Sequence, residues 1–128
     1  MTVSMEQHCI RVLLVEDEPL LRETVAEALR ERGLDVHAVA SGEAALRQLE
    51  RGEACDVLFT DINLPGSADG TTLARLARAL RPELPVVYAS GSYRRLDDVD
   101  AVPDALFVPK PYNPDRLCAV VARMTAPP

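Results

Sequence analysis

Acidic side chains follow two short apolar runs of the sequence. Glu16 and Asp17 come directly after "IRVLLV", and Asp61 ends "DVLFTD". Carboxylates that lie together repel one another unless a proton or a cation joins them. Oxygen ligands without histidine or cysteine suit Mg²⁺, which takes one or two carboxylates, keeps several waters and accepts a phosphate oxygen. If the two runs are neighbours in the fold, the three acids predict a Mg²⁺ site.

A hydroxyl and an ammonium follow two further apolar runs. Ser90 ends "PVVYAS", and Lys110 follows "ALFVP". Lys110 is the only lysine among the 14 basic side chains, and the rest are arginine. A preference for arginine does not explain this exception, and an ammonium differs from a guanidinium in being a compact point charge. An acidic cluster with a hydroxyl and a compact cation favours phosphoryl transfer.

Each of these residues also has an ordinary structural interpretation. Glu16 and Asp17 suit the dipole of a following helix. Asp61 opens the turn-like stretch "DINLPG", and a serine or a lysine after a strand is most often a loop or surface residue. The functional interpretation therefore depends on all five residues lying at one edge of one sheet.

The elements that must position these residues follow from hydrophobic periodicity. Short apolar runs alternate with segments of helical period and predict five strands, at 10–15, 34–40, 56–61, 85–90 and 105–109. Such alternation predicts a parallel α/β sheet with helices on both faces. Sites in such sheets lie beyond the carboxyl ends of the strands, where the residues above are found.

Four segments have the periodicity of amphipathic helices, and a fifth segment has only a weak helical pattern. Ser41 and Asn113 are typical N-caps. The helix after Gly70 is expected to bury Leu73, Leu76, Ala77 and Leu80. The stretch "GSYRRLDDVDAVPD" has few apolar anchors, so any helix there should be short or irregular.

Composition limits the class of protein. A chain of 128 residues fits one domain, here 10–124 between short tails at 1–9 and 125–128. A net charge of −6 argues against direct nucleic-acid binding, and no apolar stretch approaches the ~20 residues that span a bilayer. Three unpatterned cysteines are interpreted as small buried side chains, which favours a cytoplasmic location.

The ordered stretches "VLLVEDEP", "SGEAAL", "DVLFTDINLPGSADG", "PVVYASG" and "FVPKPY" resemble a bacterial response-regulator receiver domain. The resemblance covers residues 10–124. It implies a flavodoxin-like, doubly wound five-stranded parallel sheet of order 2-1-3-4-5. The weakly helical stretch falls where such a domain has its fourth helix, so that helix is expected to be short or irregular.

The resemblance also implies roles for the site residues. Asp61 would be the phosphoacceptor. Glu16 and Asp17 would hold Mg²⁺ together with Asp61, and the backbone carbonyl of Asn63 would be a further ligand.

Four residues near the last strand complete the implied set. Ser90 would be the switch hydroxyl and Lys110 the cation that pairs with the phosphoryl group. Phe107 would be the aromatic that changes rotamer as Ser90 moves, and Pro111 would carry a cis Lys–Pro bond.

The sequence departs from the family pattern at four points. Glu16 stands where aspartate is commoner, and its longer arm could shift the metal or engage it through water. The loop 61–70 looks one residue longer than usual, and Ser90 replaces the commoner threonine. Pro109 has no N–H, so the last strand should lose one bond to its neighbour.

The implied function is that of a phosphoacceptor that takes its phosphoryl group from a sensor histidine kinase or a histidine phosphotransfer protein. It would not be an enzyme, although it would phosphorylate itself and could dephosphorylate itself. The chain ends without a DNA-binding module, so output is expected through a downstream target protein. A homodimer, and an origin as a stand-alone protein or as part of a hybrid kinase, stay open.

Three other classes of protein compete with this interpretation. A phosphohydrolase with an aspartyl nucleophile often needs a second acid two residues later, where this chain has Asn63. A flavin-binding module would meet phosphate-repelling acids after the first strand. A passive interaction scaffold of the same fold stays open because of Glu16 and the longer loop.

Overall fold

The computed structural model describes residues 9–90, 101–110 and 113–125. Its five strands are β1 (Arg11–Val15), β2 (Asp35–Val39), β3 (Val57–Asp61), β4 (Val86–Ser90) and β5 (Leu106–Pro109). All pairings are parallel and the order is β2-β1-β3-β4-β5. The predicted sheet order is confirmed.

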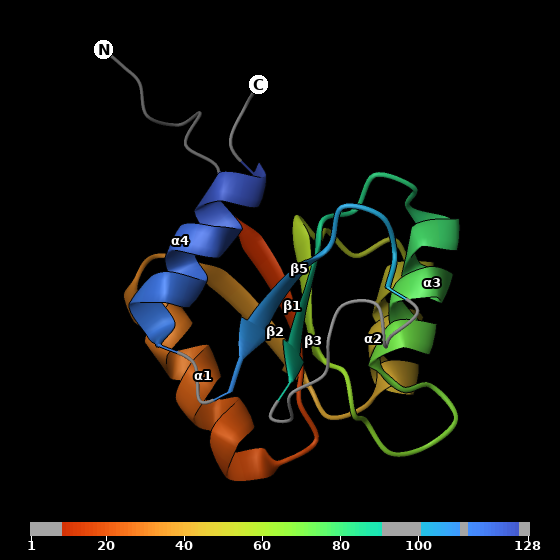
Figure 1. Cartoon of the computed structure of the whole chain (residues 1–128), viewed down its shortest axis with the longest axis horizontal. Helices are drawn as coiled ribbons and strands as arrows, with labels where there is room; N and C mark the ends of the chain where they lie inside the picture. The colour runs from red at the N-terminus through yellow and green to blue at the C-terminus, as the bar shows by residue number, and fades with distance from the viewer. Residues whose placement is uncertain (1–8, 91–100, 111–112, 126–128) are drawn as a thin grey trace.

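Helices of the described residues cover both faces of the sheet (Figure 1). They are α1 (Pro19–Glu31), α2 (Gly42–Glu50), α3 (Gly70–Leu80) and α4 (Pro114–Thr125). One core cluster joins α2 and α3 to side chains such as Leu13 and Leu58. A second joins α1 and α4 to their strand neighbours Val12 and Val57. Alternate strand residues therefore enter opposite cores, as in a sheet buried on both faces.

The helix starts follow from local hydrogen bonds. Pro19 begins α1, where its missing N–H costs nothing. The Ser41 hydroxyl accepts from the Ala44 N–H at 3.1 Å, and the Asn113 amide oxygen accepts from the Asp115 N–H at 2.7 Å. Both predicted caps are confirmed. Asp69, which the sequence had not indicated, caps α3 in the same way.

The buried face of α3 differs from the expected one. Leu73 and Ala77 are buried as predicted, but Leu76 and Leu80 are 45% and 47% exposed. Gly70 and Ala74 are buried on this face instead. The small residues on this face let α3 approach its neighbours closely. The two leucines lie at the margin of the buried face.

Two smaller expectations are also wrong. Cys9 is exposed and not buried, whereas Cys55 and Cys118 are partly buried against the two core clusters, and all three are free thiols. Pro109 need not cost a bond to β4, because β5 is an edge strand and the Lys110 N–H donates to the Ser90 carbonyl at 2.9 Å. Successive strand residues point their N–H groups to opposite sides, so the Pro109 nitrogen faces the open edge.

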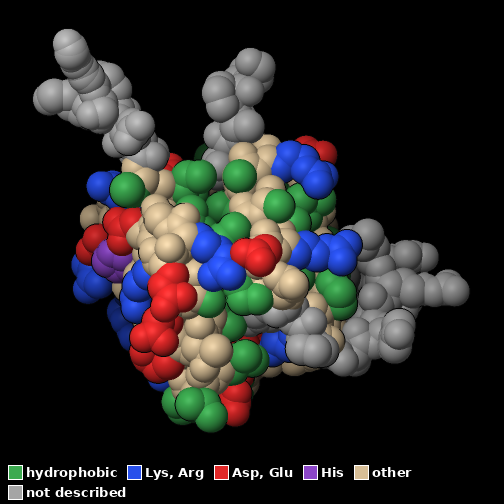
Figure 2. All heavy atoms as spheres, turned by 90° about the vertical axis from the view of Figure 1, so that its left-hand side faces the viewer, with side chains coloured by type: hydrophobic (Ala, Val, Ile, Leu, Met, Phe, Trp, Pro, Cys, Tyr) green, Lys and Arg blue, Asp and Glu red, His purple; other side chains and the backbone are tan. Residues whose placement is uncertain are grey.

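None of the described helices is both long and apolar enough to cross a membrane. On the side of the molecule where α1 and α4 lie, acidic and basic side chains are interspersed (Figure 2). One ion pair there joins Arg32 of α1 to Asp115 of α4 at 2.7 Å. The expected cis bond at Pro111 and most of the weakly helical stretch, residues 91–100, lie outside the described residues.

Candidate functional site

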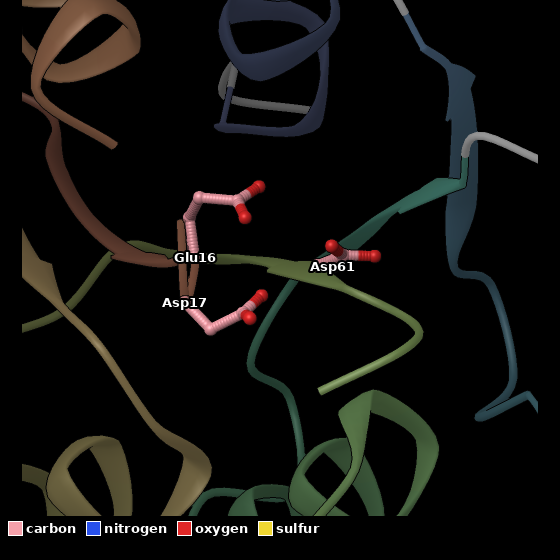
Figure 3. A group of neighbouring side chains, drawn as sticks. All are labelled: Glu16, Asp17 and Asp61. Carbon is pink, nitrogen blue, oxygen red and sulfur yellow. The ribbon is translucent and has the colours of Figure 1, made fainter. Parts of the chain in front are cut away.

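Three acids meet at the carboxyl end of the sheet. β1 and β3 are neighbours with Val15 opposite Thr60, so the next residues, Glu16 and Asp61, lie at the same edge. Figure 3 shows the carboxylates of Glu16 and Asp17 extending from the end of β1 toward Asp61. One oxygen from each of the three residues lies within 4.8 Å of the others. Glu16 and Asp61 are buried, whereas Asp17 is exposed.

Lys110 reaches this cluster from the end of β5. Its ammonium donates to Asp61 Oδ2 at 2.8 Å and to Glu16 Oε1 at 3.0 Å. Burial acts to lower the pKa of Lys110, but its hydrogen bonds to Asp61 and Glu16 outweigh that effect and raise the pKa above its ordinary value. The ammonium therefore stays charged and partly compensates two buried carboxylates.

The backbone after β3 folds back on Asp61. The Asn63 N–H donates to Asp61 Oδ1 at 3.1 Å, and the Gly70 N–H donates to the Ile62 carbonyl at 2.8 Å. A Cβ at position 70 would collide with the Asp61 carbonyl and lie 2.7 Å from Ile62 Cα. Glycine at this position thus allows α3 to begin directly against the end of β3.

Glu16 is held differently from the other two acids. Its Oε1 is bonded to Lys110, and its Oε2 accepts the Glu18 N–H at 3.1 Å. The Arg22 guanidinium donates to the Glu16 backbone carbonyl at 3.0 Å. These contacts exclude the interpretation of Glu16 as a solvated acid preceding a helix.

The hydroxyl and aromatic residues lie on the neighbouring strands. Ser90 is buried at the end of β4, one residue beyond Ala89, which pairs with Asp61. On β5, Phe107 pairs with Tyr88 of β4, and their ring centroids are 5.1 Å apart. The Tyr88 hydroxyl accepts the Val102 N–H at 3.2 Å.

The structure thus brings together Glu16, Asp17, Asp61 and Lys110, and places Ser90 and Asn63 beside them. Phe107 lies deeper along β5. Sequence reasoning missed two contacts, that of Tyr88 with Val102 and that of Glu43 with Ser67 at 2.7 Å. Neither had a sequence signal, because each joins segments that only the fold brings together.

The acidic cluster fits a hard divalent cation. All its donors are oxygens, and Mg²⁺ with ligands at 2.0–2.1 Å spans about 4.2 Å between opposite oxygens. A spread of up to 4.8 Å therefore needs only small adjustments. Asp17 is the most accessible direct ligand, because it is exposed, whereas the oxygens of Glu16 and of Asp61 already accept hydrogen bonds. A bound cation would further reduce the repulsion among the carboxylates.

Comparisons with known proteins agree with this geometry. Residues 12–122 match the family described as "Response regulator receiver domain". The sensor kinase CckA of Brucella abortus is 36% identical over 116 residues, which are 88% of this chain and 12% of that protein. The response regulator protein FleR of Pseudomonas aeruginosa is 39% identical over 115 residues, 88% of this chain and 24% of that protein. The chain thus spans less than a quarter of the length of these curated relatives.

Solved structures share the fold. A response regulator receiver protein from Sinorhizobium medicae has a TM-score of 0.85 and 33% identity, over 92% of this chain and 95% of that one. The receiver domain of the hybrid histidine kinase CckA has a TM-score of 0.76 and 34% identity, over 90% and 98% of the two chains.

Proposed function

The chain belongs to the response regulator receiver domain family, whose members accept a phosphoryl group in two-component signalling, and we propose that Asp61 is its phosphoacceptor. Asp61 would take the group from a phosphohistidine of a sensor histidine kinase or a histidine phosphotransfer protein. The observation that carries this assignment is the hydrogen bond of Lys110 to Asp61, 2.8 Å long, inside a cluster of three acids.

The proposed step is an in-line displacement at phosphorus. A carboxylate oxygen of Asp61 forms the new P–O bond as the P–N bond of the phosphohistidine breaks. The electron pair of that bond stays on the imidazole nitrogen, which takes a proton from solvent. Lys110 already lies against Asp61, so its charge needs little reorganisation to meet the incoming phosphoryl oxygens.

Mg²⁺ is the cation that we assign to the cluster, and it would neutralise oxygens of the transferring group. Asp17 and Asp61 would hold it directly, and the Asn63 carbonyl would complete the protein ligands. Glu16 would act through water or by exchanging its bond to Lys110. The chain would thus supply the acceptor carboxylate of Asp61, the ammonium of Lys110, and a group of carboxylates whose charge that ammonium partly neutralises.

Phosphorylation would alter the balance of charge at the sheet edge. The aspartyl phosphate adds about two negative charges and new acceptor oxygens. Lys110 and the Ser90 hydroxyl would turn toward them, and Phe107 would change rotamer as Ser90 moves. Because Phe107 contacts Tyr88, whose hydroxyl binds Val102, such a change would reach the segment that precedes β5.

The partners and setting are proposals of the same kind. The sequence relatives include a sensor kinase and a response regulator protein, so the domain would serve either in a hybrid kinase or as a separate regulator. We expect a cytoplasmic location, output through a protein target, and no direct contact with nucleic acid.

Intact-mass spectrometry tests the assignment. The protein is incubated with acetyl phosphate or phosphoramidate, with and without Mg²⁺. We expect one phosphate adduct that requires Mg²⁺ and is absent from Asp61→Asn. Asp56→Asn is the matched control, since Asp56 binds the Arg11 N–H at the other end of the sheet, and it should form the adduct. An adduct that survives Asp61→Asn, or none with any donor, would contradict the proposal and favour a passive scaffold.

A further inference from the structure

The loop at residues 62–69 is attached to the site at both of its ends. The Ile62 N–H donates to the Ala89 carbonyl at 2.9 Å, and the Gly70 N–H donates to the Ile62 carbonyl at 2.8 Å. Between these points the loop carries Asn63, whose N–H binds Asp61. The conformation of this loop therefore decides where the Asn63 carbonyl lies relative to the acidic cluster.

The middle of the loop is attached to α2 by one carboxylate. Glu43 Oε2 accepts the Ser67 hydroxyl at 2.7 Å and the Ser67 N–H at 3.2 Å. Next to it, a Cβ at Gly42 would lie 2.5 Å from the Ala68 carbonyl oxygen and 2.9 Å from Ala68 Cβ. The absence of a side chain at position 42 thus lets the buried Ala68 pack directly on the start of α2.

The position and charge of Glu43 favour this contact. It lies in the first turn of α2, where a negative charge is favourable. The hydrogen bond from the Ser67 hydroxyl is the largest of the effects that lower its pKa. The carboxylate is therefore ionised at neutral pH and accepts both bonds as an anion, which makes them stronger than neutral ones.

We propose that Glu43 is a positioning residue for the cation site, which holds Ser67 and thereby keeps the loop at residues 62–69 in the conformation that binds Mg²⁺. The inference rests on the proposed function, because it concerns the same cation.

The size of the effect follows from the populations of the loop. If the loop adopts the Mg²⁺-binding conformation for only a fraction of the time, the apparent dissociation constant for Mg²⁺ rises in inverse proportion to that fraction. We expect Glu43→Ala to raise it about three- to tenfold, and Ser67→Ala, which keeps the N–H bond, to raise it about two- to fivefold.

Calorimetric titration with Mg²⁺, together with urea unfolding of each variant, tests the inference. The set is Glu43→Ala, Glu43→Gln, Ser67→Ala and the double alanine variant. Glu50→Ala, exposed at the other end of α2, is the control for net charge and should bind as the wild type does. Ser67→Ala keeps every charge, so weaker binding in this variant reports the contact and not long-range attraction.

The expected result is weaker Mg²⁺ binding in Glu43→Ala and Ser67→Ala, with the double variant no worse than Glu43→Ala. Glu43→Gln, which keeps an acceptor oxygen, should lie between the wild type and Glu43→Ala. Mg²⁺ affinities of Glu43→Ala and Ser67→Ala equal to that of the wild type would overturn the inference, even if the variants unfold more easily. If Glu43→Ala does not fold, Ser67→Ala and Glu43→Gln decide in the same way.

The failure of this inference differs from the failure of the proposed function. In the first case the wild type binds Mg²⁺ and forms the adduct at Asp61, and the variants at positions 43 and 67 do the same with unchanged affinity. In the second case the wild type forms no adduct, or forms one that survives Asp61→Asn, whatever the variants at positions 43 and 67 do.

Discussion

The two ends of the sheet carry the same kinds of charged side chain in opposite surroundings. At the amino end, Arg11 and Asp35 form an ion pair of 3.6 Å with both side chains nearly half exposed. At the carboxyl end, Lys110 lies 2.8 and 3.0 Å from two carboxylates whose side chains are only 9% and 3% exposed. Charge type does not distinguish the ends, but burial does.

Burial changes the energetic meaning of a charge. An exposed pair is screened by water and contributes little. Removing carboxylates from water costs several kcal/mol per ion, and one ammonium between two of them compensates only partly. The carboxyl end therefore carries an unfavourable excess of negative charge, which a bound cation can reduce. The same arrangement holds the Asp61 carboxylate against the Lys110 ammonium. Buried like charges of this kind are typical of functional sites.

The largest effect on stability should come from removing the ammonium. Lys110→Met leaves Glu16 and Asp61 without their shared cation, and we expect the free energy of unfolding to fall by about 2 kcal/mol, less than for a fully buried pair because Lys110 is partly exposed. Arg11→Met at the amino end should cost less than about 0.5 kcal/mol. Urea unfolding without Mg²⁺ measures both, and saturating Mg²⁺ should restore part of the loss only in Lys110→Met. Equal losses of unfolding free energy in the two variants would contradict the inference that burial distinguishes the two ends of the sheet.

The next effect concerns the cation. Asp17 is an exposed acid whose carboxylate faces Asp61, so Asp17→Asn should weaken Mg²⁺ binding at least about tenfold, or about 1.4 kcal/mol. Asp35→Asn removes the same charge at the other end and should change the affinity by less than about twofold, because surface charges a Debye length away are screened. Calorimetric titration compares the two. Similar losses would mean that net charge, and not the cluster, attracts the cation.

A smaller effect is expected in the core between the ends. Tyr88→Phe removes the hydroxyl that accepts the Val102 N–H, and we expect it to lower the free energy of unfolding by about 1 kcal/mol. Mg²⁺ affinity should stay within about twofold of the wild type, because the bond that is lost joins Tyr88 to Val102 and involves no carboxylate of the cluster. Urea unfolding and Mg²⁺ titration check these outcomes. A large loss of Mg²⁺ affinity would show that the core and the site are coupled before phosphorylation.

The smallest effect should be that of pH between 7 and 9. The pKa of Lys110 is raised in the folded protein, so its contribution to stability is complete below the unfolded pKa of about 10.4. It is lost only as pH rises through the folded pKa. The difference in unfolding free energy between the wild type and Lys110→Met should thus be constant from pH 7 to 9 and shrink above about pH 10.5. A difference that shrinks below pH 9 would contradict the raised pKa.

Much of the fold and the membership of the site follow from the sequence. Strands buried on both faces are continuous apolar runs, as in "RVLLV", and parallel strands bring their carboxyl ends to one edge. Together with the strand order that the family resemblance implies, that rule places Glu16, Asp17, Asp61 and Lys110 at one site. The caps at Ser41 and Asn113 were predictable because they depend on a local hydrogen bond.

The parts that could not be predicted depend on packing between distant segments. Helical periodicity gives the direction of an apolar stripe but not its width, so Leu76 and Leu80 were expected inside and lie outside. The partner of Glu43 is 24 residues away in the sequence and is set by the path of a loop. Glu16 was predicted as a metal ligand, but its bond to Lys110 depends on the reach of both side chains and appears only in the folded site.

Mapping the phosphorylated residue tests the central claim most directly. The protein is treated with acetyl phosphate and Mg²⁺, and borohydride then reduces the acyl phosphate to homoserine, which peptide sequencing by mass spectrometry can locate. The account predicts homoserine at position 61 alone, and none when Mg²⁺ is withheld. Homoserine at position 17, 5-hydroxynorvaline (the reduction product of a glutamyl phosphate) at position 16, or a phosphate adduct that yields neither product would contradict it.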